Sequence, residues 1–214
     1  MFTAFLPIKY ESERVLHKNF RLINKKPLFF YILNTLSKIE LINEIVIDFD
    51  QEKVSLKIEE YFSNIKFIQR DKNLLDPKES VNKLIESNLQ HFKNDYIIQT
   101  HVTNPLLKTT TIQNALNKYV ENLNPIFSVT KHQARFYNSK LKPINHDLKQ
   151  LLPTQHLDAI YEENSNFYIF SKTQFLKYRR RINNKSEIFE IPKLESIDID
   201  DEQDLELVKK ILAS

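Results

Sequence analysis

The sequence contains no glycine in 214 residues, where average usage of about 7% predicts roughly 15. Glycine enters positive-φ conformations without steric cost and lets the backbone approach a phosphate closely. Its absence argues against a conventional glycine-rich phosphate loop. It also leaves left-handed turn positions to other residues, and we expect the plentiful asparagines to fill them.

Cysteine is absent as well, which excludes a disulfide framework and a thiolate metal site. Neither sign of charge dominates, because 31 basic residues face 28 acidic ones for a net charge of +3. The basic residues are scattered, so the sequence does not indicate a nucleic-acid partner. There is no charged N-terminal segment followed by an apolar one, and no apolar run approaches about 18 residues. We expect a soluble, cytoplasmic protein with no membrane partner.

Short apolar runs alternate with segments of helical period along the chain. The predicted strands are 2–8, 43–50, 65–70, 95–102, 125–131, 166–170 and 196–200. The predicted helices are 27–39, 51–62, 78–93, 109–122, 171–178 and 201–213. This alternation predicts one α/β domain over residues 1–214, with a mostly parallel sheet and helices on both faces. The polar segment 132–156 breaks the alternation and predicts a hairpin or an extended excursion.

The stretch "LPIKYESERVLHKNFRLINKKPL", residues 6–28, follows the first predicted strand. Within it, Lys9, Arg14 and Lys18 lie close together beside Ser12 and Asn19. A triphosphate requires guanidinium and ammonium groups of this kind. On charge alone, a phosphate-binding loop and a solvated basic surface loop remain equally open.

Asp198 and Asp200 belong to the predicted last strand, "SIDID". Residues two apart on a strand project to the same face, which leaves Ile197 and Ile199 for the core. Two carboxylates at a strand end suit Mg²⁺ that also contacts substrate phosphates. The alternative is that Asp200 or Asp201 caps the final helix. The two interpretations are compatible if Asp201 is the cap.

The stretch "QTHVTNPL", residues 99–106, places short polar side chains after a buried strand. Gln99, His101, Thr103 and Asn104 could hydrogen-bond a base or a sugar, because ligands of open α/β sheets lie at the carboxyl ends of strands. A polar turn is the alternative. The other five histidines show no metal-ligand spacing, so we do not expect His101 to bind a metal.

Together these motifs resemble those of the cytidylyltransferases that activate acidic sugars, the CMP-N-acylneuraminate synthetases and their legionaminate- and pseudaminate-type relatives. The family's opening motif, IPARGGSKRxPxKNxRxxxGKPL, aligns without a gap with residues 6–28. "HVTNPL" resembles the family's QPTSPL, "YEENSNFYIF" its YEENGAFYIF, and "SIDIDDEQDLE" its SIDIDTEEDLE. Four motifs in family order cover nearly the whole chain. The resemblance implies a three-layer Rossmann-like nucleotide-diphospho-sugar transferase fold, with a protruding dimerisation segment at 132–156.

The resemblance also implies an activity and a set of site residues. CMP would pass from CTP to a nine-carbon 2-keto sugar acid, giving CMP-sugar and pyrophosphate, in a homodimer. The residues implied for nucleotide binding are Lys9, Ser12, Arg14, Lys18, Asn19 and Arg70. Those implied for the sugar are His101, Thr103, Gln155, Tyr161, Glu162 and Asn164. Asp198 and Asp200 would hold Mg²⁺, and Arg14, Lys18 and Asp200 would carry the catalysis.

The chain departs from the family pattern where phosphate would bind. The family's Arg-Gly-Gly is Lys9-Tyr10-Glu11 here, and the next basic position is Glu13. Tyr10 and Glu11 do not enter positive-φ conformations at low cost, and Glu13 adds negative charge beside phosphate. Two alternatives therefore remain. One is a catalytically silent homologue that binds a nucleotide or a partner protein, and the other is a cytidylyltransferase for a 3-deoxy-octulosonate.

Overall fold

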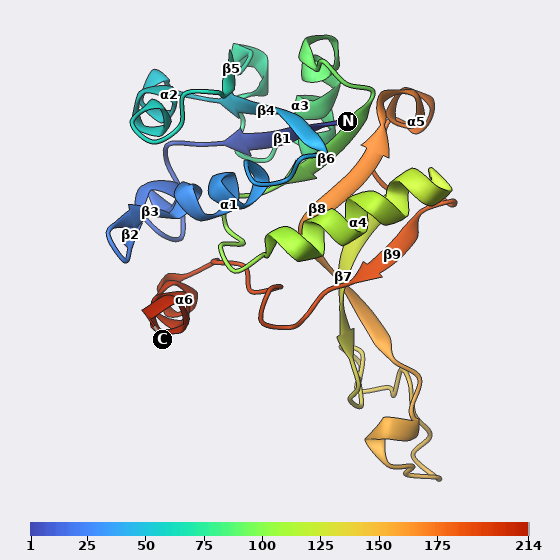
Figure 1. Cartoon of the computed structure of the whole chain (residues 1–214). Helices are drawn as coiled ribbons and strands as arrows, with labels where there is room; N and C mark the ends of the chain where they lie inside the picture. The colour runs from blue at the N-terminus through green and yellow to red at the C-terminus, as the bar shows by residue number, and fades with distance from the viewer. Residues whose placement is uncertain (214) are drawn as a thin grey trace.

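The computed structural model describes residues 1–213 and centres on a seven-stranded sheet in the order β5-β4-β1-β6-β8-β7-β9 (Figure 1). The strands are β1 (Phe2–Ile8), β4 (Ile42–Phe49), β5 (Lys66–Gln69), β6 (Tyr96–Thr100), β7 (Ile126–His132), β8 (Ile160–Ser171) and β9 (Glu187–Glu190). Only β8 runs antiparallel to its neighbours β6 and β7, while all other pairs in this sheet are parallel. The predicted α/β fold with a mostly parallel mixed sheet is confirmed.

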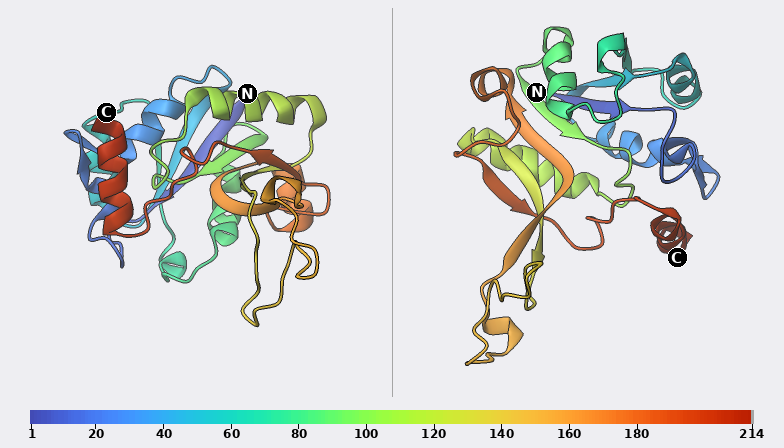
Figure 2. Two further views of the ribbon diagram at one scale, coloured as in Figure 1. Left: turned by 90° about the horizontal axis from the view of Figure 1, so that it is seen from below. Right: turned by 180° about the vertical axis from the view of Figure 1, so that it is seen from behind.

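Helices cover both faces of the sheet and make three layers (Figure 2). The helices are α1 (Leu28–Leu36), α2 (Glu52–Glu59), α3 (Val81–Asn88), α4 (Thr109–Asn122), α5 (Lys172–Tyr178) and α6 (Glu202–Ala213). The apolar faces of α1, α2 and α4 share one core with the sheet, and those of α3 and α5 share a second core on its other face. A third cluster joins α6 to the loop after β1 through Val15, Ile199 and Leu205.

The sequence explains these layers directly. In α1, Phe29, Ile32, Leu33 and Leu36 recur at helical spacing and are all buried, which gives the helix one apolar face toward the sheet. The central strand β1 is buried almost throughout, because its two neighbours pair with it and helices cover both its faces.

Residues 133–159, between β7 and β8, project from the body as an arm (Figures 1 and 2). The predicted polar excursion at 132–156 lies here. The arm is held by its own bonds, among them those from Asn145 Nδ2 to the carbonyls of Ala134 (2.8 Å) and Asp158 (3.0 Å). It contains one short 3₁₀ turn, Thr154–His156.

Two predictions about the elements are wrong. Residues 196–200 form no strand, because the segment passes beyond the end of β6, where the bond from the Ile199 N–H to the Thr103 carbonyl is not extended into a ladder. The predicted helix at 78–93 is shorter, with α3 followed by a 3₁₀ turn at Leu89–His91. The edge strand β9 was not predicted, since its four residues, Glu-Ile-Phe-Glu, form neither a long apolar run nor an alternating pattern.

Seven residues of the described chain have positive φ. They are His17, Asn24, Lys25, Leu123, Leu141, Ser165 and Arg179. Only one of them is an asparagine, so the expectation that asparagine replaces glycine at these turns is wrong. Within residues 1–213, no helix is long and apolar enough to cross a membrane.

Candidate active site

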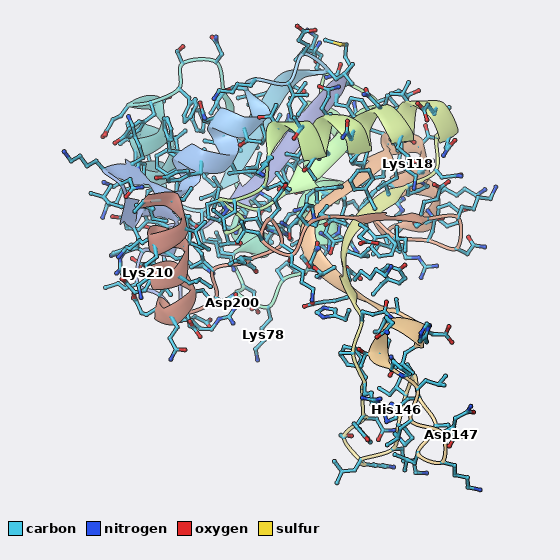
Figure 3. The ribbon with its side chains drawn as sticks, turned by 60° about the horizontal axis from the view of Figure 1, so that its bottom comes forward. Lys78, Lys118, His146, Asp147, Asp200 and Lys210 are labelled. Carbon is cyan, nitrogen blue, oxygen red and sulfur yellow. The ribbon has the colours of Figure 1, made fainter. Side chains whose placement is uncertain are left out.

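A cavity of about 650 Å³ lies at the carboxyl ends of β1, β4, β5 and β6. All six residues predicted for the nucleotide line it, and so do His101 and Thr103 from the predicted sugar set. These residues come from distant parts of the chain, and the parallel strands bring their ends to one edge of the sheet. Asp200 lies beside α6 on the body of the molecule, far from His146 and Asp147 on the arm (Figure 3).

The loop after β1 is shaped by side chains. Asn19 Nδ2 donates to the Lys9 carbonyl (2.8 Å), and the Tyr10 N–H donates to Asp50 Oδ1 (2.8 Å). The loop's one positive-φ residue is His17 (φ 50°), so Tyr10 and Glu11 avoid the conformation that would strain them. The loop therefore closes without a glycine.

The Tyr10 ring occupies space that a glycine would leave empty. Its centroid lies 4.8 Å from that of His17 and 5.1 Å from that of Phe20, and Lys53 Nζ lies 5.3 Å from it. Phe20 in turn packs edge-on against Phe29 of α1. These aromatic contacts pack the loop against α1.

Two cations of the loop reach the closing segment 197–201. Arg14 Nη2 donates to Asp200 Oδ1 (2.5 Å), and Lys18 Nζ donates to the Ile199 carbonyl (2.5 Å) and lies 3.8 Å from Asp200. Burial lowers the pKa of Lys18, and the charges of Asp198 and Asp200 oppose that shift. Lys18 thus brings a partly desolvated positive charge to the cavity wall.

The closing segment is held by one backbone bond and by a helix cap. The Ile199 N–H donates to the Thr103 carbonyl (2.9 Å). Asp201 Oδ1 accepts from the N–H groups of Gln203 (2.8 Å) and Asp204 (3.0 Å), so Asp201 is the N-cap of α6. Because Asp201 and not Asp200 caps the helix, the Asp200 carboxylate faces Arg14 and Lys18. A cap at Asp201 is the arrangement in which Asp198 and Asp200 remain available for Mg²⁺.

Asp198 has the features of a cation ligand. Its Oδ1 is buried and has no hydrogen-bond partner within residues 1–213. Burial raises the pKa of Asp198, the neighbouring Asp200 raises it further, and a hydrogen bond from Thr103 opposes both. An unpaired buried carboxylate oxygen beside a second carboxylate fits Mg²⁺. In the described chain no three acidic or histidine side chains cluster for a metal, so water and phosphate oxygens would complete the shell.

Arg70 forms the wall of the cavity at the end of β5. Its Nε donates to Asp48 Oδ1 (2.5 Å), and Asn88 Nδ2 donates to Asp48 Oδ2 (2.9 Å). The Arg70 and Asp48 side chains are each 1% exposed. Arg70 Nη1 is buried and has no partner within residues 1–213, so one donor of a fixed guanidinium is available for a ligand.

The other predicted sugar residues do not line this cavity. Gln155 lies on the arm, and Tyr161 and Glu162 are exposed at the start of β8, where Glu162 pairs with His132 (2.7 Å). Asn164 is buried between β7 and β8, bonded to Ser128 (2.6 Å) and Thr130 (3.0 Å). A sugar contact by these four residues stays a prediction.

The sequence analysis missed several cavity residues. Asp50 follows the buried strand β4 directly, so the strand-end argument used for the other residues applies to it as well. The wall near α3 consists of Leu75, Pro77, Glu79, Val81 and Leu84. The four apolar residues of this wall carry no chemical signal in the sequence.

A doubly wound α/β fold with cations around a strand-end cavity is typical of nucleotide-binding proteins, and two carboxylates lie beside two of these cations. The family model for cytidylyltransferases matches residues 3–212. The chain therefore belongs to the cytidylyltransferase family and is a nucleotidyltransferase, which confirms the resemblance seen in its motifs.

Individual relatives are distant but align end to end. The chain is 27% identical over 218 residues to the pseudaminic acid cytidylyltransferase of Campylobacter jejuni (serotype O:23/36, strain 81-176), covering 96% of this chain and 94% of the relative. It is 23% identical over 222 residues to the CMP-N,N'-diacetyllegionaminic acid synthase of Legionella pneumophila, covering 98% and 95%.

Solved structures share the fold at lower identity. A CMP:2-keto-3-deoxy-manno-octonic acid synthetase complexed with CTP superposes with a TM-score of 0.73 at 13% identity, over 99% of this chain and 98% of that one. The 4-diphosphocytidyl-2C-methyl-D-erythritol synthase of Anaerococcus prevotii gives 0.69 at 11% identity, over 100% and 96%. Both confirm the Rossmann-like architecture.

Proposed function

We propose that this protein transfers CMP from CTP to a nine-carbon 2-keto sugar acid of the sialic acid type. The observation that carries the proposal is that Lys9, Arg14, Lys18 and Arg70 line one cavity. Asp198 and Asp200 do not line it, but they lie beside two of these cations, Asp200 next to Arg14 and Lys18 and Asp198 near Lys18. The names of the aligned relatives, with pseudaminic and diacetyllegionaminic acid, support the sugar class.

The reaction asks little covalent chemistry of the chain. The anomeric hydroxyl oxygen forms a bond to the α-phosphorus, the bond from that phosphorus to the β-phosphate oxygen breaks, and the hydroxyl loses its proton to solvent. Pyrophosphate leaves. Positioning and charge neutralisation carry such a transfer. Lys18 and Arg14 would neutralise phosphate charge, and Arg70 would orient the nucleotide through its free Nη1.

Asp198 and Asp200 are the residues that would hold Mg²⁺. A bound Mg²⁺ orients phosphate oxygens and neutralises their charge. The ion pair of Arg14 with Asp200 is exposed, with side chains 64% and 45% accessible respectively, so it can rearrange when a nucleotide enters.

The test is pyrophosphate release from the purified protein with CTP, UTP or ATP and a panel of sugar acids. We expect turnover with CTP only, and with a nine-carbon acid in preference to 3-deoxy-octulosonate. Turnover with 3-deoxy-octulosonate alone would contradict the sugar class. Absence of CTP binding at millimolar concentration would contradict the transferase and favour the silent homologue.

Asp200→Asn tests the metal assignment. We expect loss of Mg²⁺-dependent turnover by about 10²-fold or more, with an unchanged thermal unfolding temperature, because Asp200 is partly exposed. Glu206→Gln, an exposed acid on α6, is the matched control and should leave turnover unchanged. Full activity of Asp200→Asn would refute the assignment.

We also propose that a second copy of this chain covers the arm. The arm exposes a run of apolar side chains that its own fold leaves uncovered: Tyr137 (47% exposed), Leu141 (81%), Ile144 (57%), Leu148 (59%) and Leu151 (65%). Several exposed large apolar side chains on one projecting segment are typical of protein interfaces.

Sedimentation velocity tests the dimer. The wild type should sediment as a dimer and Leu151→Glu should shift it toward monomer. Leu56→Glu on α2, at similar exposure (56%), should not. A monomeric wild type would contradict the proposal.

A further inference from the structure

The histidine on the wall of the cavity is held by a bond from within the sheet. His101 lines the cavity, and its Nε2 lies 3.1 Å from Nε2 of Gln99. Gln99 is fully buried on β6, two residues earlier and on the same face of the sheet. The proton position on His101 therefore depends on which way the Gln99 amide points.

Arg181 decides the orientation of that amide. Its Nη1 donates to Gln99 Oε1, and a guanidinium has donors only. The NH₂ end of Gln99 then faces the Thr100 carbonyl (3.0 Å) and His101 Nε2. A reversed amide would set NH₂ against the guanidinium and oxygen against the carbonyl, so both ends oppose the flip.

The oriented amide leaves one arrangement for His101. Nε2 faces an N–H donor, so it must accept, and the ring proton must lie on Nδ1. An imidazolium would place two N–H groups face to face. In agreement, burial together with the charges of Arg181 and Lys18 lowers the pKa of His101 to about 4. His101 is thus neutral at pH 7.

Arg181 is itself held firmly from outside β6. Its guanidinium carbon lies 3.8 Å from the centre of the Tyr168 ring, which is 2% exposed. Tyr168 on β8 is the cross-strand partner of Gln99. The arginine follows α5, and 82 positions separate it from Gln99 in sequence. Three elements therefore meet around one amide.

We propose that Arg181 is a positioning residue which, through Gln99, keeps His101 as a neutral Nδ1–H donor at the cavity. Its Nδ1 makes no hydrogen bond within residues 1–213, so it is free to donate to an oxygen of the ligand. That this ligand is the acidic sugar rests on the proposed function. The tautomer itself does not.

The first experiment reads the tautomer. Two-bond ¹H–¹⁵N spectra of histidine-labelled protein at pH 7, assigned with His101→Gln, should show the Nδ1–H form. Arg181→Met should abolish the single Nδ1–H tautomer and raise the pKa of His101 toward 6.5. Arg180→Met, at the exposed neighbouring position, should change neither. An Nε2–H or imidazolium form in the wild type overturns the proposal even if Arg181→Met does not fold.

The second experiment separates the sugar from the nucleotide. Arg181→Met should raise KM for the sugar acid about tenfold and leave KM for CTP unchanged, since one oriented hydrogen bond is lost. Arg181→Lys, which retains a donor, should recover part of the loss. Equal changes in both KM values would indicate a merely structural role. A wild type without transferase activity would refute the proposed function while leaving the tautomer result to stand.

Discussion

The loop after β1 and the hairpin turn between β2 (Leu22–Ile23) and β3 (Lys26–Pro27) replace family glycines in opposite ways. In the loop, Tyr10 and Glu11 stand at the glycine pair and keep negative φ, with the positive φ moved to His17. In the turn, Lys25 stands at the family glycine and has a positive φ of 66°. The loop therefore avoids positive φ at its glycine positions, whereas the turn adopts it.

The difference follows from what each backbone has to do. The type I′ hairpin turn, which matches the twist of its strands, requires positive φ at both central positions. Asn24 and Lys25 have positive φ, which costs about 1 kcal/mol for the lysine. The loop has no register to keep, so an aromatic stack and the Asp50 bond can close it instead. Ser165, at the glycine of the family's YEENG, resembles the turn, with φ 58°.

The largest effect on activity should come from removing the charge of Lys18 in the loop after β1. If this loop binds phosphate through cations more than through backbone N–H groups, Lys18→Met should lower kcat/KM for CTP by about 10²–10³-fold. Its unfolding temperature should change little, because methionine retains the apolar stem. Lys57→Met on the exposed face of α2 is the control. A decrease in kcat/KM of less than tenfold would show that backbone N–H groups, and not the cations, bind the phosphates.

Restoring the family glycine should damage the loop. Tyr10→Gly removes the ring packed against His17 and Phe20 and loosens the chain, so we expect a loss of about 2 kcal/mol in the free energy of unfolding. Urea denaturation measures it. Tyr10→Phe keeps the ring and should be nearly neutral, and a Tyr10→Gly variant as stable as the wild type would contradict the packing argument.

The backbone clamp of the loop should matter less than the ring. Asp50→Ala leaves the Tyr10 N–H without its acceptor and should cost about 1 kcal/mol in the same assay. Asp50→Asn keeps an acceptor oxygen and should retain most of the stability. Equal losses in the two variants would assign the effect to the charge of Asp50 instead of its bond.

The smallest effect, and the only gain, should appear at the turn. Lys25→Gly relieves the left-handed strain and should stabilise the protein by about 0.5 kcal/mol after the added chain entropy. Lys25→Ala retains the Cβ and should give no gain. If both variants have the same denaturation midpoint, the strain at this turn is negligible.

Most of the architecture was predictable from the sequence because it depends on local period. The spacing of Phe29, Ile32 and Leu36 marks a helix face, and the apolar runs mark buried strands. That Lys9, Arg14, Lys18 and Arg70 line one cavity was predictable too, since residues that follow buried parallel strands meet at one edge of the sheet. The strand predicted at 196–200 was wrong because strand pairing depends on tertiary neighbours, and this segment bonds to the Thr103 carbonyl beyond the end of β6.

The sequence by itself determined the α/β alternation, the family, and the cations that line the cavity. Only the tertiary structure decided how the glycine-free loop closes and which way Gln99 points. The physical reason is that these features rest on single contacts between distant residues, Tyr10 with Asp50 and Arg181 with Gln99. Such contacts produce no periodic pattern in the sequence. Each joins one side chain to a partner that is brought near it only when the chain folds.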